Sequence, residues 1–142
     1  VICQVTESPE KFKGLPLGSR AVQIADGSTG NYFLRTFGRS PRSTVCACEV
    51  SFAPSLSQAL HLLNGDTLQK KISGGGVVKA LLDAGATPEA VIDDLFLRCL
   101  SRPPSDEERA ELMAHVSSED PRGSLEDVFW ALLNSREFLF QH

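Results

Sequence analysis

Residues 124–133 read SLEDVFWALL, and this stretch carries the most regular helical pattern in the sequence. Its apolar positions are spaced i, i+3, i+4, i+7 and i+8, and they are Leu125, Val128, Phe129, Leu132 and Leu133. That spacing places them on one face of an α-helix, as in a helix that packs on a core. Ser124 and Asp127 are expected to cap the start of this helix.

Residues 87–100, TPEAVIDDLFLRCL, predict a second helix with a broad apolar face. Thr87 suits the N-cap and Pro88 the first helical position, while Pro103-Pro104 are expected to stop the helix. We expect this helix to be central and to share a core with the first. The residues predicted to be buried together are Val91, Leu95, Phe129, Leu132 and Leu133.

A third helix is predicted to start at Ser105. Glu108 follows three residues later, which is the capping-box spacing. Ala110, Met113 and Val116 are expected to face inward from this helix.

Shorter helical signals fill the rest of residues 54–142. They are a capping-box pair at Ser55 and Gln58, a helix start at Asp66, a stop at Gly74–Gly76, a short helix over 77–84 closed by Gly85, and a final turn within 134–140 anchored by Phe138 and Phe140.

Residues 1–53 are interrupted by frequent glycine and proline. Partial alternation of apolar and polar residues makes short extended pieces plausible at Arg20–Ile24 and Thr44–Val50. The aromatic run from Tyr32 to Phe37 fits either one helical turn or an aromatic plug under a loop.

The sequence therefore predicts a mainly α fold: about five helices in a compact bundle, preceded by an irregular N-terminal segment with little or no strand. A chain of 142 residues is expected to form a single domain, irregular over 1–53 and helical over 54–142. No apolar stretch approaches the roughly 20 residues needed to span a bilayer, so no membrane span is expected.

Charge is spread unevenly along the chain. Residues 1–86 carry nine basic and six acidic side chains, a net of +3, whereas residues 87–142 carry five and twelve, a net of −7. The overall charge of −4 argues against a general nucleic-acid binder. The two halves are expected to pack on one another or to face different partners.

Three arginines, Arg35, Arg39 and Arg42, lie in a stretch without acids and beside aromatic residues. Guanidinium groups suit carboxylates, sulfates and phosphates, and aromatic rings stack on sugars, so an anionic glycan is a candidate ligand. The alternative, which we favour, is structural: Arg35 or Arg39 binds backbone carbonyls or acids of the second half.

Cysteine spacing gives weak signals for redox or metal chemistry. Cys46 and Cys48 are candidates for a redox pair or half of a metal site, but on a strand they would point to opposite faces. The alternative is half-buried thiols, or disulfides to Cys3 or Cys99. No Cys-x-x-Cys-His motif and no zinc-type ligand pairing is present, so no metal, haem or other cofactor is expected.

Other ionisable residues are expected to be packed or surface residues rather than catalytic ones. His61 has no nucleophile and orienting acid evident near it. Glu107, Glu108 and Glu111 sit at a capped helix start, where acids match the helix dipole, rather than as a catalytic pair. No catalytic residue is predicted.

Several stretches resemble one family. They are FLRTFGR at 33–39, STVCACE at 43–49, LSQALHLLN at 56–64, LRCLSRPP at 97–104 and ALLNSREFLF at 131–140. Together they are similar to the C-terminal part of a domain of unknown function that is abundant in planctomycete bacteria.

That resemblance implies a large exported parent protein, often with an upstream planctomycete-type cytochrome c domain, and hence an extracytoplasmic or periplasmic location. It implies no activity. The chain starts at Val1 rather than Met, so a processed product or a fragment is expected.

The leading functional hypothesis is a non-catalytic helical module for interaction or assembly, whose partners include other domains of the parent protein. The alternatives are an accessory domain of an enzyme system that processes anionic polysaccharides, and a docking module for the cytochrome domain. A docking module should expose an apolar patch rimmed by charge.

Overall fold

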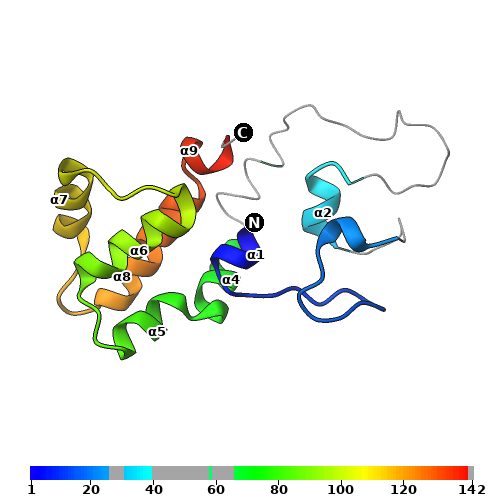
Figure 1. Cartoon of the computed structure of the whole chain (residues 1–142), viewed down its shortest axis with the longest axis horizontal. Helices are drawn as coiled ribbons and strands as arrows, with labels where there is room; N and C mark the ends of the chain where they lie inside the picture. The colour runs from blue at the N-terminus through cyan, green and yellow to red at the C-terminus, as the bar shows by residue number, and fades with distance from the viewer. Residues whose placement is uncertain (26–30, 40–57, 59–65, 141–142) are drawn as a thin grey trace. The chain divides into compact units, whose positions relative to one another are not determined.

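In the part of the chain that the structure describes, the regular structure is helical (Figure 1). The computed structural model describes residues 1–25, 31–39, 58 and 66–140. In those ranges the order is α1 (Ile2–Val5), a 3-10 turn η1 (Ala21–Gln23), α2 (Tyr32–Thr36), α4 (Asp66–Gly75), α5 (Val77–Asp83), α6 (Pro88–Leu100), α7 (Asp106–His115), α8 (Pro121–Leu133) and α9 (Arg136–Leu139). No strand occurs among them, and five of these helices have seven residues or more, so the mainly α prediction is confirmed.

The chain divides into two compact units. Unit 1 combines Val1–Ser8 with Leu68–His142, and unit 2 is Pro9–Thr67. Unit 1 is therefore discontinuous in sequence, since its first eight residues precede unit 2. The predicted extended piece at 44–50 and the predicted helix start at Ser55 lie outside the described residues.

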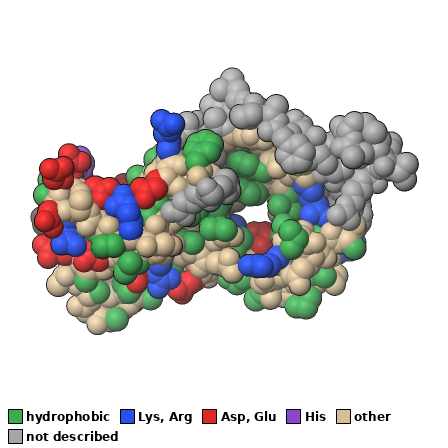
Figure 2. All heavy atoms as spheres, turned by 45° about the horizontal axis from the view of Figure 1, so that its top comes forward, with side chains coloured by type: hydrophobic (Ala, Val, Ile, Leu, Met, Phe, Trp, Pro, Cys, Tyr) green, Lys and Arg blue, Asp and Glu red, His purple; other side chains and the backbone are tan. Residues whose placement is uncertain are grey.

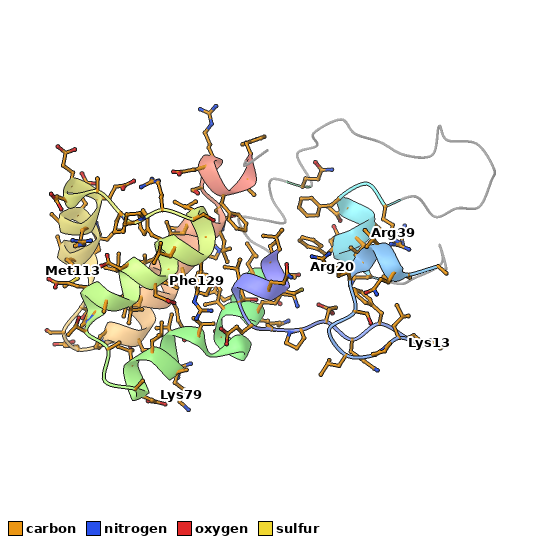
Figure 3. The ribbon with its side chains drawn as sticks, viewed as in Figure 1. Lys13, Arg20, Arg39, Lys79, Met113 and Phe129 are labelled. Carbon is orange, nitrogen blue, oxygen red and sulfur yellow. The ribbon has the colours of Figure 1, made fainter. Side chains whose placement is uncertain are left out.

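The core of unit 1 lies between α6 and α8, the two helices with the broadest apolar faces. Every residue of the predicted common core is buried, from Val91 and Phe129 with no exposed surface to Leu132 at 8%. Figure 3 labels Phe129 in this packed region. The prediction of a shared core is confirmed.

Local signals at the ends of α6 act as expected. The Thr87 hydroxyl accepts a hydrogen bond from the backbone N–H of Ala90, with Pro88 in the first turn. The helix ends at Leu100, and Ser101 follows in the left-handed region at φ 56°. The chain thus leaves the helix shortly before Pro103.

The start of α7 matches the prediction, but its inward face does not. Ser105 accepts from the Glu108 N–H at 3.2 Å, and the Glu108 carboxylate accepts from the Ser105 N–H at 2.7 Å. Ala110 is exposed, however, and Met113 and Val116 are only half-buried. Among the described elements, α6 is the main packing partner of α7. One side of α7 is therefore covered, and the rest of the helix faces solvent.

The start of α8 lies earlier than predicted. Asp120 is the N-cap and accepts from the Gly123 N–H at 2.9 Å, and Pro121 opens the first turn. Ser124 is inside the helix, where its hydroxyl donates to the Asp120 carbonyl, and Asp127 is exposed one turn further on. An acid followed by proline is itself a helix start, and it supplied the cap that we expected from Ser124.

Three glycines in and around α4 and α5 have distinct roles. Gly76, at φ 67°, occupies the left-handed region between the helices, and Gly85, at φ 84°, follows α5 as predicted. Gly75 touches the N-terminal segment so closely that a Cβ there would lie 1.6 Å from the carbonyl oxygen of Thr6. Thr6 is fully buried, and Lys71 Nζ donates to the Ser8 carbonyl at 3.3 Å.

Two expectations, one for Arg20–Ile24 and one for the final turn, need correction. Within the extended piece expected at Arg20–Ile24, residues Ala21–Gln23 instead form the turn η1, in which the Gln23 N–H donates to the Arg20 carbonyl at 2.9 Å. The final turn, α9, forms as predicted with Ser135 as its N-cap. Phe138 is half-buried, but Phe140 is 71% exposed and does not anchor it.

Candidate functional site

The predicted anion site begins with α2, a helix closed at both ends by local hydrogen bonds. The Asn31 side chain accepts from the Leu34 N–H at 3.1 Å. After the helix, Gly38 at φ 83° donates to the Arg35 carbonyl and the Arg39 N–H donates to the Leu34 carbonyl at 2.9 Å. These two bonds are a Schellman motif, which requires the left-handed conformation that glycine adopts without strain.

Arg39 is placed by that motif against the turn η1. Its Nη1 donates to the Ala21 carbonyl and its Nη2 to the Ile24 carbonyl, both at 2.8 Å. The side chain thus binds backbone carbonyls, as the structural alternative predicts, and it joins the end of α2 to η1, where its two partners lie 15 and 18 residues earlier in the sequence.

Arg35 has a different environment from Arg39. It is exposed on the last turn of α2, three residues after Tyr32, which is 65% exposed. Arg42 lies outside the described residues. Anion binding by the three arginines therefore stays a prediction, with Arg35 as its most accessible member in the described part of the chain.

The candidate redox or metal residues, Cys46 and Cys48, lie outside the described residues. His61 lies outside them as well. Cys3 and Cys99 carry free thiols, and burial raises the pKa of Cys99 to about 12. Across the described ranges, no three His, Cys, Asp or Glu side chains lie close enough together to hold a metal ion.

The densest ionic cluster in the described residues is centred on Arg102, after the end of α6. Its guanidinium donates to both oxygens of Glu108 at 2.8 Å and to both oxygens of Glu137 at 2.7 and 2.8 Å. Its charged centre also lies 5.4 Å from the centroid of the Phe96 ring. We call Arg102, Glu108 and Glu137 the Arg102 cluster; it joins the end of α6 to α7 and α9.

Arg98, one turn before Arg102, makes a second cluster. It bonds Asp94 within α6 and Glu7 from the N-terminal segment. Glu7 is held at φ 51°, a left-handed conformation unusual for a residue other than glycine. The ion pair with Arg98 ties this turn to the central helix.

The outer surface of unit 1 is acidic over α7. Figure 2 shows acidic side chains gathered at the left of the view, and Asp106, Glu107 and Glu111 are the exposed acids of the helix. Arg109 donates from α7 to Asp93 of α6 at 2.9 Å. Of Glu107, Glu108 and Glu111, the three glutamates of α7, Glu108 is the one that belongs to the Arg102 cluster.

The electrostatics of these clusters favour the charged forms. Hydrogen bonds from Arg102, with a further one from the Ser105 backbone, lower the pKa of Glu108 to about 2, and Arg102 also lowers the pKa of Glu137. The carboxylates in turn raise the pKa of Arg102. Burial opposes the charge on Arg98, but the bonds to Glu7 and Asp94 outweigh it and raise its pKa.

Sequence reasoning did not find these clusters. Glu108 was identified as a capping residue, but nothing in its spacing indicates a bond to Arg102. The Glu7–Arg98 pair spans 91 residues. The one available signal was the placement of Arg98 in the last turn of a predicted helix, where a cation is favoured.

Comparison with known proteins gives one family. Residues 6–116 match the model of a family described as PSD1, protein of unknown function (DUF1553). The curated proteins and the solved structures contain no significant match. Because the matched region covers well over half of the chain, and contains α2, α6 and α7, the chain belongs to the DUF1553 (PSD1) family of proteins of unknown function.

Proposed function

We propose that the chain is a non-catalytic helical module that serves interaction or assembly within a larger, exported bacterial protein. The contacts of Arg98, Arg102 and Arg109 carry this proposal, because each of these arginines bonds a carboxylate of the same chain. The shifted pKa values agree with it. Each pKa that is clearly shifted among the described residues moves away from neutrality: carboxyls move down, guanidinium groups move up, and the Cys99 thiol rises to about 12. A general acid or base works best with a pKa near the operating pH, which is the opposite tuning.

The use of charge in unit 1 supports the same proposal. Arg98, Arg102 and Arg109 each bind carboxylates of the same chain and join one element to another. Arginines neutralised in this way contribute to orientation of the helices rather than to binding of an anionic substrate. They support a rigid scaffold whose outer surface remains for partners.

The location and parent protein rest on the resemblance. The similarity to a domain of large exported proteins supports a location outside the cytoplasm. It also supports an association with other domains, including a cytochrome c domain. Among the described residues, no helix has both the length and the apolar character required to cross a membrane.

The test compares the parent polypeptide with and without these 142 residues. We expect removal to lower the number of polypeptide copies in the assembly, or to abolish association with a neighbouring domain. Light scattering after gel filtration measures both. We also expect the purified chain to turn over no acidic polysaccharide. Two results together would contradict the proposal: the purified chain cleaves an acidic polysaccharide, and assembly of the parent polypeptide is unchanged when the 142 residues are removed.

A further inference from the structure

The N-terminal part of unit 2 folds into three consecutive turns, each closed by a backbone hydrogen bond. The first spans residues 12–15 and the second residues 16–19, and the bonds from the N–H of the fourth residue to the carbonyl of the first measure 3.2 and 3.3 Å. Their third residues, Gly14 and Gly18, lie at φ 80° and 82°, the left-handed conformation that a type II turn requires. The third turn is η1, which follows directly.

Each turn exposes one side chain at its tip. The second residue of the first turn is Lys13, and that of the second turn is Leu17, which is 65% exposed. The central residue of η1 is Val22, at 84% the most exposed large hydrophobic residue in the described part of the chain. One exposed aliphatic side chain is common on a protein surface, but two at successive turn tips form a pattern.

The turns are fastened from within unit 2, which fixes the side chains that remain outside. Phe12 and Ile24 are buried, at 7% and 5% exposure. Arg39 donates to the carbonyls of Ala21 and Ile24, so it holds both the start and the end of η1. Leu17 and Val22 are therefore presented to solvent by a framework whose own apolar anchors are already packed.

Basic side chains alternate with the two aliphatic tips. The exposed basic residues of this segment are Lys11, Lys13 and Arg20. Leu17 lies between Lys13 and Arg20, both labelled in Figure 3, and Val22 follows two residues after Arg20. Residues 9–25 contain one acid, Glu10, so their net charge is 3 − 1 = +2 in a chain of net charge −4. We call Lys13, Leu17, Arg20 and Val22 the turn surface.

We propose that the turn surface docks on a lipid bilayer with anionic headgroups. Leu17 and Val22 enter the boundary between headgroups and acyl chains, while Lys13 and Arg20 lie among the lipid phosphates. This inference rests on the proposed function and names a partner of the interaction module, since an exported module is exposed to a membrane surface. Apolar insertion and basic attraction act together here, because either alone gives weak and reversible binding.

The order of side chains on the turn surface favours a bilayer over a folded protein. A protein interface has a continuous apolar centre with a polar rim, whereas here basic and aliphatic side chains alternate. A fluid lipid interface accepts each aliphatic side chain separately and supplies a phosphate beside it. A nucleic acid would match the basic residues but would leave Leu17 and Val22 in water.

The test is sedimentation of the full chain with sucrose-loaded vesicles. One set contains equal parts of phosphatidylcholine and phosphatidylglycerol, and the other contains phosphatidylcholine alone. We expect binding to the anionic vesicles to be roughly tenfold tighter or more, because two basic side chains gain from the surface potential. Affinity should fall several-fold between about 50 and about 200 mM NaCl. Soluble glycerol phosphate should not displace the chain, since it offers no apolar layer.

Four variants separate the apolar and basic parts of the turn surface. Leu17→Ser and Val22→Ser should each weaken binding about fivefold or more and keep its salt dependence, because buried apolar surface is lost without a change in charge. Lys13→Gln and Arg20→Gln should each weaken binding about fivefold and reduce its salt dependence.

Matched controls come from unit 1. Leu97→Ser removes an aliphatic side chain that is 53% exposed on α6, and Lys79→Gln removes an exposed charge from α5. Both should bind like the wild type. Val22→Leu keeps an aliphatic tip and should also bind like the wild type. Equal thermal unfolding of the serine variants and the wild type shows that the fold is intact.

Leu17→Trp reports insertion directly. The natural chain has a single tryptophan, Trp130, half-buried in α8. With anionic vesicles, the emission of Leu17→Trp should shift to the blue and be quenched by brominated acyl chains, whereas wild-type emission should not change. A bound Leu17→Trp chain whose added emission stays that of a water-exposed indole would show that the tip does not enter the lipid.

Three further outcomes would overturn the inference. The chain binds neither type of vesicle or both equally, the unit 1 controls weaken binding as much as the turn variants, or soluble glycerol phosphate displaces the chain. Self-association that Val22→Ser abolishes, in sedimentation velocity without lipid, would assign the surface to a second copy instead. Failure to bind vesicles while the parent polypeptide still needs these 142 residues for assembly defeats this inference alone. Polysaccharide cleavage with unchanged assembly defeats the proposed function.

Discussion

Arg102 shows how one side chain can join three elements. It follows α6, binds Glu108 in the first turn of α7, and binds Glu137 in α9. Both contacts use two oxygens of a carboxylate, which is the geometry in which a guanidinium is strongest. Because the cluster lies at the surface, solvent screens it and its contribution to stability is modest.

The Arg102 cluster predicts a pH dependence of stability. The pKa of Glu108 is lowered from 4.5 to about 2, so the unfolded chain binds protons that the folded chain does not. The stabilisation is therefore complete above about pH 4.5 and is lost as the pH falls towards about 2. We expect the difference in unfolding free energy between wild type and Arg102→Gln, measured with urea, to shrink over that window.

Arg136→Gln is the control for this experiment. Arg136 is exposed on α9, close in sequence to Glu137, and has no ion pair among the described residues. Its difference from the wild type should stay constant with pH. A constant difference for Arg102→Gln as well would show that the cluster does not shift the titration of Glu108.

Arg39 illustrates a structural arginine in unit 2. Replacing it with Ala should lower the unfolding free energy by about 1–3 kcal/mol, because the carbonyls of Ala21 and Ile24 each lose a charged donor. Urea unfolding measures the change. Arg35→Ala, on the exposed face of α2, is the matched comparison and should stay within about 0.5 kcal/mol of the wild type. Equal effects of the two changes would show that the hydrogen bonds of Arg39 to η1 do not stabilise the protein.

At the scale of elements, helix ends in this chain are set by short-range chemistry. Thr87 and Ser105 cap α6 and α7 as their spacing predicts. The start of α8 was wrongly predicted, although its signal was also local. Asp120-Pro121 is a cap followed by a first-turn proline, and Gly123 does not break the helix because the Asp120 side chain binds its N–H.

Asp120→Ala tests that cap. Loss of the side-chain acceptor should lower the unfolding free energy by about 1 kcal/mol. Asp127→Ala removes the same charge from an exposed position within α8 and should change stability by less than about 0.5 kcal/mol. Chemical denaturation of the two variants decides between them, and a larger loss for Asp127→Ala would restore the later start of the helix.

Adjacent glycines in α4 offer a second matched pair. A Cβ at Gly75 would lie 1.6 Å from the Thr6 carbonyl oxygen, so the N-terminal segment would have to move. We expect Gly75→Ala to destabilise unit 1 by about 1–3 kcal/mol or more. Gly74 has no atom within 4 Å of its Cβ position, so Gly74→Ala should stabilise the helix by about 0.5–1 kcal/mol.

Thermal and urea unfolding of both glycine variants provides the measurement. Opposite signs for the two neighbours are the expected result. If both substitutions stabilise the protein, the close approach of α4 to Thr6 is absent in solution.

On the scale of the whole molecule, unit 1 is held by one continuous apolar core and closed by its own N-terminus. The core lies between α6 and α8, and the first eight residues join it through buried Thr6 and the Glu7–Arg98 pair. Unit 1 carries six more acidic than basic side chains, and unit 2 carries two more basic than acidic ones.

Leu132→Ala tests the core of unit 1. Leu132 is 8% exposed in α8, and truncation should cost about 2–5 kcal/mol through lost burial and a cavity. Leu97→Ala is the control, since Leu97 is 53% exposed on α6 and should cost less than about 0.5 kcal/mol. A loss for Leu132→Ala as small as that of the control, in urea unfolding, would exclude Leu132 from the core.

Much of the fold was accessible from sequence. The i, i+3, i+4 spacing identified α6 and α8 and their buried faces, and α2 was one of two alternatives for its aromatic run. Solvent exposure was harder to predict. Ala110 in α7 and Phe140 after α9 are exposed because few elements cover those edges, which depends on the arrangement of the helices.

The sequence by itself determined the helical class, the two core helices and the N-caps of α6 and α7, because a helical face repeats every 3.6 residues and a cap acts within one turn. Only the tertiary structure decided which charges meet. Arg102 with Glu137, Arg98 with Glu7, and Arg39 with the η1 carbonyls join residues between 15 and 91 positions apart. Such bonds depend on the path of the chain between their ends, and no local spacing encodes that path.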